Sequence, residues 1–272
     1  MTLREAIAAA ASRLTGLSDT PRLDAELLAA HALGTSRETL LLRHLDEDAP
    51  AGFEPLVVRR EASEPIAYIV GLKDFWTITL GVAPGVLIPR PDSETLIEAA
   101  VAHFGKAGPA TILDLGTGSG ALLLAALDQW PQARGIGIDL SDRAVEIAAA
   151  NARHLGMQNR ASIISGDWDQ AVEGRFDLIL CNPPYIATDE ALPPSVSHYE
   201  PATALFAGAD GLVEYRRLAP RIGRLLAPGG LALFEIGAAQ GPAVAALFRA
   251  EGHEPRIIRD LAGLDRCIAL SG

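Results

Sequence analysis

Cysteine is nearly absent from this chain. Cys181 and Cys267 are the only two, and neither stands in a C-x-x-C or Cys/His spacing. This argues against both a disulfide framework and a metal site, so we expect no metal. Two lone thiols are typical of proteins in a reducing compartment.

Long apolar runs are also missing. A membrane-spanning helix needs about 18 or more apolar residues in a row, and we find no such stretch in the sequence. The first residues, MTLREAIAAAASRLTG, are too charged and too rich in alanine for a signal peptide. We therefore expect a cytoplasmic protein with no membrane contact.

Basic residues are fewer than acidic ones. The chain has 23 Lys+Arg against 34 Asp+Glu, for a formal net charge of -11. Extended binding to nucleic-acid phosphates requires a basic surface, because the phosphates are neutralised by lysine and arginine. The composition therefore predicts no direct nucleic-acid partner.

The first part of the chain, residues 1–72, has the pattern of several short helices. Apolar residues recur at helical spacing from Leu3 to Leu14, and Pro21 follows Thr20 where a second helix should begin. Neither a glycine-rich loop nor a cluster of titratable residues occurs here. We expect a small helical domain that docks a partner rather than one that catalyses.

The second part begins with a short linking segment, residues 73–91. The stretch DFWTITL alternates in the manner of a strand, and glycine and proline follow it, which predicts a β-hairpin between two domains.

The remaining residues, 92–272, alternate between strand and helix patterns. The predicted strands are TILDL, RGIGIDL, ASIISGD, FDLILCN, LALFEIG, PRIIRDL and DRCIALSG. Helical stretches between most of the first five imply a parallel sheet covered on both faces. Only Ala262, Gly263 and Leu264 separate the last two strands, so these must pair antiparallel. The fold class is α/β, with a mostly parallel sheet and a helical lead-in.

A glycine-rich loop follows the first of these strands. Gly116, Gly118 and Gly120 let the backbone turn tightly and approach a ligand, with a helix N-terminus beside it. Asp139 ends the next strand, where a carboxylate can bond ribose hydroxyls. The loop and Asp139 fit a nicotinamide dinucleotide and S-adenosylmethionine equally well, and a purely structural tight turn remains an alternative.

Two features favour S-adenosylmethionine. Asp114 completes a D-x-G-x-G-x-G pattern with Thr117 and Ser119 between the glycines, and places an acid near the ammonium end of this cofactor. Asp167 and Trp168 follow the third strand, and in this topology that strand end lies beside the adenine. Trp168 can pack against the base, although it could also be an ordinary core residue.

The stretch Asn182-Pro183-Pro184-Tyr185 follows the fourth strand. That strand end borders the crevice where open α/β sheets bind ligands. The prolines cannot donate hydrogen bonds, so they leave the carbonyl oxygens of Asn182 and Pro183 as fixed acceptors. The side-chain oxygen of Asn182 adds another acceptor, and Tyr185 offers an aromatic wall.

Such an acceptor array suits a planar NH2 group. The lone pair of a primary amide or of an exocyclic base amine is delocalised, so the nitrogen is a poor nucleophile. Two acceptors that hold its N–H bonds orient the nitrogen and stabilise the positive charge that develops on it. The alternative interpretation is an ordinary proline turn.

Several stretches together resemble one family. LIPRPDSE, ILDLGTGSG, GDW, CNPPYI and EPATAL, with DFW before them and DLAGLDR after them, are similar to the peptide-chain release factor glutamine N5-methyltransferase family. The resemblance covers essentially the whole chain. It implies a class I S-adenosylmethionine-dependent methyltransferase fold, with a seven-stranded sheet that ends in an antiparallel hairpin.

The resemblance also implies a reaction. The methyl group of S-adenosylmethionine would pass to the glutamine of the Gly-Gly-Gln motif in peptide chain release factors, leaving S-adenosylhomocysteine. The glycine loop with Asp114, Asp139, Asp167, Trp168 and Asn182 would contact the cofactor. Asn182 to Tyr185 would hold the glutamine, with Asn182, Pro183 and Tyr185 as the catalytic set.

Two other functions remain open. One is methylation of an exocyclic amine of adenine or guanine in nucleic acid, and the other is a regulatory module that only binds S-adenosylmethionine. Arg90, Glu94, Glu235 and the loop 186–211 receive no assigned role, although the length of that loop favours a substrate lid.

We predict that Asp139→Ala weakens cofactor binding by roughly 1–3 kcal/mol, because hydrogen bonds to a charged acceptor are lost. Isothermal titration calorimetry with S-adenosylmethionine measures this change. An unchanged affinity in a folded variant would remove Asp139 from the site.

Overall fold

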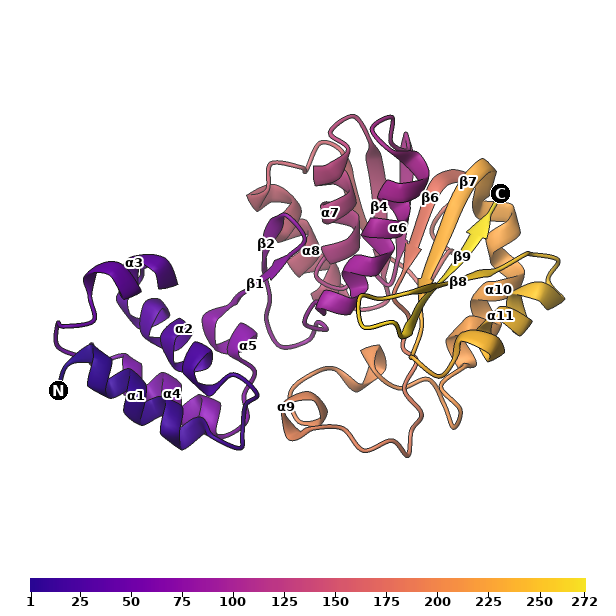
Figure 1. The fold of residues 1–272 in the computed structure, drawn as a ribbon. Helices are drawn as coiled ribbons and strands as arrows, with labels where there is room; N and C mark the ends of the chain where they lie inside the picture. Colours follow the sequence, from indigo (N-terminus) through magenta and orange to yellow (C-terminus); the bar gives the residue numbers. More distant parts are fainter. The chain divides into compact units, whose positions relative to one another are not determined.

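The structure is a computed structural model that describes residues 1–272 (Figure 1). The chain divides into two compact units. The first unit contains residues 1–72 together with 192–199, and the second contains residues 73–191 and 200–272.

The first unit is helical, as expected. Its helices are α1 (Leu3–Leu14), α2 (Pro21–Leu33), α3 (Arg37–Arg43), α4 (Phe53–Glu61), α5 (Ile66–Val70) and, from the segment 192–199, α9 (Pro194–Ser197). Thr20 precedes α2, but its hydroxyl bonds the Asp24 side chain rather than the backbone of the first turn. The hydroxyl of Tyr199 donates to the carbonyl oxygen of Ala62 at 2.8 Å, which holds the segment 192–199 against the end of α4.

Few polar groups are buried in the first unit, and they are paired. Arg60 donates to Asp24 at 2.8 Å with both side chains only 9% exposed. Removing either partner of this buried pair would destabilise the fold, because the other would remain as a buried charge without compensation. The apolar core around this pair comes from α1, α2, α3, α4 and α5.

The second unit begins with the expected hairpin. Strands β1 (Leu72–Phe75) and β2 (Ile78–Gly81) form a two-stranded sheet. Trp76 lies in the turn between them with φ +54°, a left-handed conformation that side chains other than glycine adopt infrequently.

A seven-stranded sheet forms the body of the second unit. Its order is β5-β4-β3-β6-β7-β9-β8. The strands are β3 (Thr111–Leu115), β4 (Arg134–Asp139), β5 (Ala161–Ser165), β6 (Phe176–Cys181), β7 (Leu226–Glu235), β8 (Arg256–Arg259) and β9 (Asp265–Ser271). Five strands are parallel, and β9 runs antiparallel to both β7 and β8, which confirms the predicted sheet.

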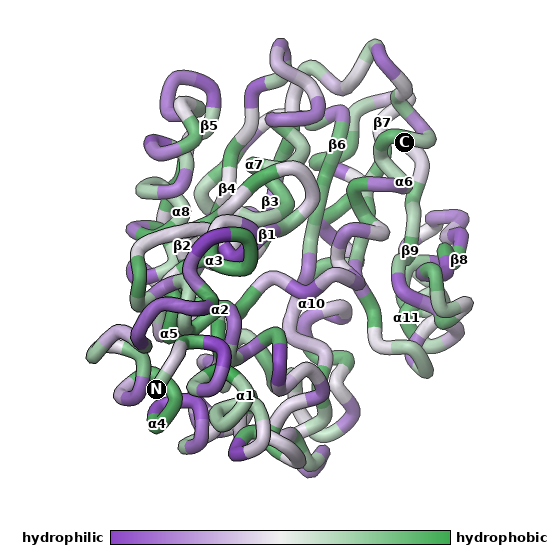
Figure 2. Tube along the Cα trace, turned by 60° about the vertical axis from the view of Figure 1, so that its left-hand side comes forward, coloured by the Kyte–Doolittle hydropathy of each residue, from purple (hydrophilic) through white to green (hydrophobic).

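Helices cover both faces of this sheet. They are α6 (Glu94–Phe104), α7 (Ala121–Gln129), α8 (Asp142–His154), α10 (Val213–Leu225) and α11 (Gly241–Ala250). Alternate residues of β6 point to opposite faces, so Leu178 and Leu180 join a core with α6 and α7, whereas Ile179 joins a core with α10 and α11. Figure 2 shows β6 as a largely hydrophobic strand, as expected for one that is covered on both sides.

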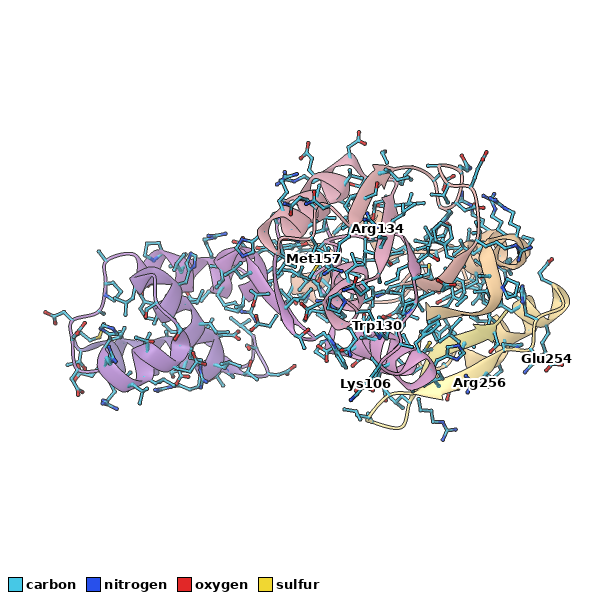
Figure 3. The ribbon with its side chains drawn as sticks, turned by 90° about the horizontal axis from the view of Figure 1, so that it is seen from above. Lys106, Trp130, Arg134, Met157, Glu254 and Arg256 are labelled. Carbon is cyan, nitrogen blue, oxygen red and sulfur yellow. The ribbon has the colours of Figure 1, made fainter.

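The core under α7 includes Trp130 and Met157, both labelled in Figure 3. The indole nitrogen of Trp130 donates to the carbonyl oxygen of Gly105 at 2.9 Å, so this large side chain is buried without an unpaired donor. None of the helices is both long enough and apolar enough to span a membrane.

The register of the parallel strands decides which residues meet at the edge of the sheet. Leu115 of β3 pairs with Ile138 of β4 on one side and with Cys181 of β6 on the other. The residues that follow these strands therefore share one edge, where open parallel sheets bind ligands.

Candidate active site

A cavity of about 420 Å³ lies at this edge of the sheet. Most of the residues expected from the sequence line it: Asp114, Gly116, Thr117, Gly118, Ser119, Asp139, Asp167, Trp168, Asn182 and Pro184. Gly120, Pro183 and Tyr185 are not among the lining residues. The volume is in the range of small-molecule sites.

The glycine loop forms one wall of the cavity. Gly116 has φ +72° and Gly118 has φ +58°, conformations that favour glycine. A Cβ atom on Gly116 would lie 3.2 Å from the ring of Trp168, so the absence of a side chain also keeps the cavity open. Gly120 has a different role, because a Cβ there would lie 2.9 Å from Leu124 of the following helix.

Asp139 holds the loop in place from the end of β4. Its Oδ2 accepts a hydrogen bond from the Gly118 amide and its Oδ1 one from the Ser141 amide, both at 2.9 Å. Each carboxylate oxygen has a further lone pair. This carboxylate is therefore preorganised to accept from hydroxyl groups of a ligand in the cavity.

Asp114 is the most deeply buried acid of the cavity wall, at 1% exposure. Its Oδ2 accepts from the Thr117 hydroxyl at 2.6 Å and from the Leu123 amide at 3.3 Å. Its Oδ1 has no hydrogen-bond partner. Burial raises the pKa of Asp114 to about 7. A cationic ligand group would therefore both pair the free oxygen and favour the ionised carboxyl.

Another part of the cavity wall carries a connected set of polar side chains. The Trp168 indole nitrogen donates to Glu214 at 2.7 Å. Arg217 donates to Glu214 at 2.8 Å and to Asp167 at 2.6 Å. Glu214 and Arg217 belong to α10 and also line the cavity. Sequence analysis missed both, because no local motif marks them.

The Asn-Pro-Pro-Tyr stretch borders the cavity beside the glycine loop. The Nδ2 of Asn182 donates to the hydroxyl of Ser93 at 3.2 Å, and Ser93 ends the 3-10 helix η1 (Pro91–Ser93). The Oδ1 of Asn182 and the carbonyl oxygens of Asn182 and Pro183 take part in no hydrogen bond of the structure. Three acceptors are thus unoccupied at this strand end.

Tyr185 is not part of the cavity lining. Its hydroxyl donates to Oε1 of Glu235 at 3.2 Å, and its carbonyl oxygen accepts from Gln240 at 2.9 Å. The ring packs against the core that α10 and α11 share with the sheet. Burial and the neighbouring Glu235 raise the pKa of Tyr185 well above its ordinary value, so the phenol keeps its proton.

Arg90, Glu94 and the loop 186–211, which received no assigned role, lie next to residues of the cavity wall in the chain. Glu200 is buried and accepts from the Ile88 amide at 3.1 Å, and it also pairs with Arg90. Glu94 accepts from the Trp76 amide at 2.8 Å. The second half of the loop 186–211 lines the cavity through Pro201, Thr203, Ala204 and Phe206, around the 3-10 helix η2 (Ala202–Ala204).

Two family descriptions match the chain. "PrmC N-terminal domain" matches residues 5–71, and "Methyltransferase small domain" matches residues 92–200.

Curated relatives match nearly the whole chain. A release factor glutamine methyltransferase of Rhodospirillum rubrum is 46% identical over 254 residues, which cover 91% of this chain and 78% of the relative. One of Caulobacter vibrioides is 42% identical, over 98% of this chain and 96% of the relative.

Solved structures are similar in fold to a large part of this chain, at low sequence identity. A methyltransferase from Pyrococcus furiosus has a TM-score of 0.55 at 17% identity, covering 80% of this chain and 96% of its own. A T. thermophilus 16S rRNA methyltransferase, solved with AdoMet and guanosine, has a TM-score of 0.55 at 20% identity, covering 74% and 49%.

The raised pKa of Asp114 predicts that binding of S-adenosylmethionine depends on pH. Below about 7 this carboxyl is largely protonated, so the cationic ligand loses a charged partner. Affinity should rise with pH between about 5.5 and 7, by up to about tenfold per unit. Calorimetry over this range measures the slope. Asp114→Asn, which has no proton to lose, should flatten it, and an equal slope in both proteins would contradict the assignment.

Proposed function

The chain belongs to the family of release factor glutamine methyltransferases, and from this premise we infer that it methylates the side-chain amide nitrogen of glutamine in the Gly-Gly-Gln motif of peptide chain release factors. The observation that carries this inference is similarity along both units, at 42% identity over 98% of the chain. Methyltransferases that share only the second unit's fold act on many substrates, so the fold by itself would not select one.

The residues of the cavity fit S-adenosylmethionine as the cofactor. We propose that Asp114 and the loop from Gly116 to Ser119 hold its methionine end, since the free oxygen of buried Asp114 suits a cation. Asp139 would accept from the ribose hydroxyls, and Asp167 with Trp168 would form the adenine pocket. When bound, the cofactor supplies an electrophilic methyl group on a sulfonium.

Asn182 and Pro183 would receive the substrate glutamine. Their free carbonyl oxygens and the Asn182 Oδ1 can accept both N–H bonds of a primary amide. Held in this way, the amide nitrogen presents its lone pair to the cavity, and the acceptors stabilise positive charge that develops on it. Pro184 lines the cavity, whereas Tyr185 anchors the segment through the hydrogen bond from its hydroxyl to Glu235.

We further propose a division of labour along the chain. Residues 1–72 would dock the release factor, residues 73–91 would link the two domains, and residues 92–272 would bind the cofactor and transfer the methyl group. The similarity of the relatives over the helical part supports a role that is specific to the protein substrate. The similarity to an RNA methyltransferase does not favour a nucleic-acid substrate, because at 20% identity it extends to the fold alone.

The proposed reaction predicts a specific pattern of labelling. With methyl-labelled S-adenosylmethionine, the protein should label an intact release factor but neither its Gly-Gly-Ala variant nor structured RNA. Intact factor should have a higher kcat/KM than a short Gly-Gly-Gln peptide, because only the former can dock on residues 1–72. Label in RNA, or in the Gly-Gly-Ala factor, would refute the proposed substrate.

Asn182 should act as an acceptor and not as a base. Asn182→Leu keeps a similar volume but removes the acceptor, so its single-turnover rate should fall by at least about 10²–10³-fold. Asn182→Asp keeps acceptor oxygens and adds a charge near the sulfonium. Cofactor affinity should hold or increase in this variant, while turnover falls less than in the leucine variant.

Both Asn182 variants must be folded by circular dichroism, and assays with saturating release factor separate chemistry from docking. Equal residual rates in the two folded variants would argue against the acceptor model.

A further inference from the structure

The indole ring of Trp168 is held in the cavity wall by a charged side chain. Its nitrogen donates to Oε2 of Glu214 at 2.7 Å. Glu214 is 17% exposed, and Arg217 of the same helix donates to the same oxygen at 2.8 Å. Arg217 also donates to both carboxylate oxygens of Asp167, at 2.8 and 2.6 Å. Two residues of α10 thus bind two consecutive residues of the segment that follows β5, and all four line the cavity.

The next residue of this segment is bound by the same helix. Asp169 is fully buried, accepts from Arg221 at 2.7 Å and pairs with Arg224. The four residues of α10 that bind the segment recur at spacings of three and four, so they lie on one face of the helix. We call Glu214, Arg217, Arg221 and Arg224 the α10 stripe. The stripe therefore fixes three successive residues of the cavity side of the sheet.

The backbone of Trp168 is in an infrequent conformation. Its φ is +54°, in the left-handed region that residues with a Cβ atom seldom adopt. Such conformations persist where the surroundings hold them, and they are concentrated at ligand sites. The residues on both sides, Asp167 and Asp169, are bonded to the α10 stripe. The direction of the Trp168 side chain is therefore set by tertiary contacts and not by local preference.

The place of the ring matters for the cavity. A Cβ atom on Gly116 would lie 3.2 Å from the ring of Trp168 and 4.0 Å from the carbonyl oxygen of Asn182. The ring and one of the proposed substrate acceptors therefore lie beside the same point of the glycine loop. A displaced ring would change the space that a ligand of this loop can occupy.

A tryptophan that only fills the core would not require this arrangement. Trp130 is buried, and its indole nitrogen donates to a backbone carbonyl oxygen, so no charged group is needed. Trp168 has a carboxylate as acceptor, which makes a stronger hydrogen bond. That carboxylate has its own cationic partner in Arg217. A pair of opposite charges that fixes one ring in a cavity wall indicates a role in the site.

We propose that Glu214 is a positioning residue for the cofactor. Through its hydrogen bond to the indole nitrogen, and with Arg217 beside it, Glu214 fixes the Trp168 ring as the surface against which the adenine of S-adenosylmethionine packs. This rests on the proposed function, since it assigns a role within the cavity that would hold this cofactor. Glu214 acts through Trp168.

Glu214→Leu removes the acceptor and should weaken the binding of S-adenosylmethionine about 5- to 30-fold, as measured by calorimetry. This factor is part of what stacking between a base and an aromatic ring contributes. Glu214→Gln keeps an acceptor oxygen, and the two donors that face it select the orientation of its amide. Its affinity should lie within about threefold of the wild type. Equal losses in the two variants would overturn the proposal.

Trp168→Phe tests whether Glu214 acts through the indole. This variant keeps an aromatic ring but has no N–H group for Glu214 to hold. In the Trp168→Phe protein, Glu214→Leu should therefore weaken binding by less than about twofold. The full loss in both backgrounds would mean that Glu214 contacts the cofactor directly, and the proposal would be wrong. If the leucine variant does not fold, Glu214→Ala replaces it in both backgrounds, because alanine is the best helix former.

Tryptophan emission gives a readout that needs no cofactor. The chain has 3 tryptophans, so subtracting the emission of Trp168→Phe isolates the signal of Trp168. In Glu214→Leu this signal should shift in wavelength and be quenched more strongly by acrylamide, because the ring is no longer held. A lower melting temperature with an unchanged signal would mark Glu214 as merely structural and overturn the proposal.

The kinetic effect should be confined to the cofactor. In Glu214→Leu the KM for S-adenosylmethionine should rise, whereas the KM for the release factor should not, because the α10 stripe holds the cofactor side of the cavity. The opposite pattern would contradict the proposal. Glu98→Leu is the matched control, since it makes the same change on the exposed face of α6 and should leave both constants and the emission unchanged.

The outcomes also separate this inference from the function beneath it. If the wild type binds no S-adenosylmethionine or labels no release factor, the proposed function fails. If the wild type does both and Glu214→Leu binds the cofactor equally well, only the role of Glu214 fails.

Discussion

The site depends on the register of three parallel strands. Because Leu115 lies opposite both Ile138 and Cys181, strands β3, β4 and β6 end at one level. The glycine loop, Asp139 and Asn182 follow these ends and so meet around one cavity. A shift by one residue on any of these strands would exchange the side chains of its two faces and move the loop away from its partners.

The wall of the cavity is rich in acidic side chains. Asp114, Asp139, Asp167 and Glu214 all line it, and Arg217 is bonded to the last two of these acids. Asp114 has an oxygen without a partner, and burial keeps its pKa about 7. Burying a carboxyl is unfavourable by itself, and a positive ligand group beside Asp114 would offset that cost.

The division of the chain into two units does not follow the order of the sequence. Residues 192–199 belong with the helical first unit, although they lie within the loop 186–211 of the second. The second unit resumes at Glu200, which is buried, accepts a hydrogen bond from the Ile88 amide and pairs with Arg90. Residues directly after it line the cavity. Residues 192–199 of the proposed docking unit are therefore followed in the sequence by Glu200 and then directly by residues that line the cavity.

The sequence by itself determined the features that rest on local physics: the alternation of strands and helices, the glycines with positive φ at Gly116 and Gly118, and the antiparallel final hairpin. It also marked Asn182, since two prolines after an apolar strand are an unusual local pattern. The order of the sheet, with β9 between β7 and β8, was decided only by tertiary packing. So were the partners Ser93, Glu214 and Glu235, because they lie between 46 and 89 residues from the site residues that they bond. Contacts over such separations leave no periodic or motif signal, since they arise only when the strands and helices that carry them are packed together.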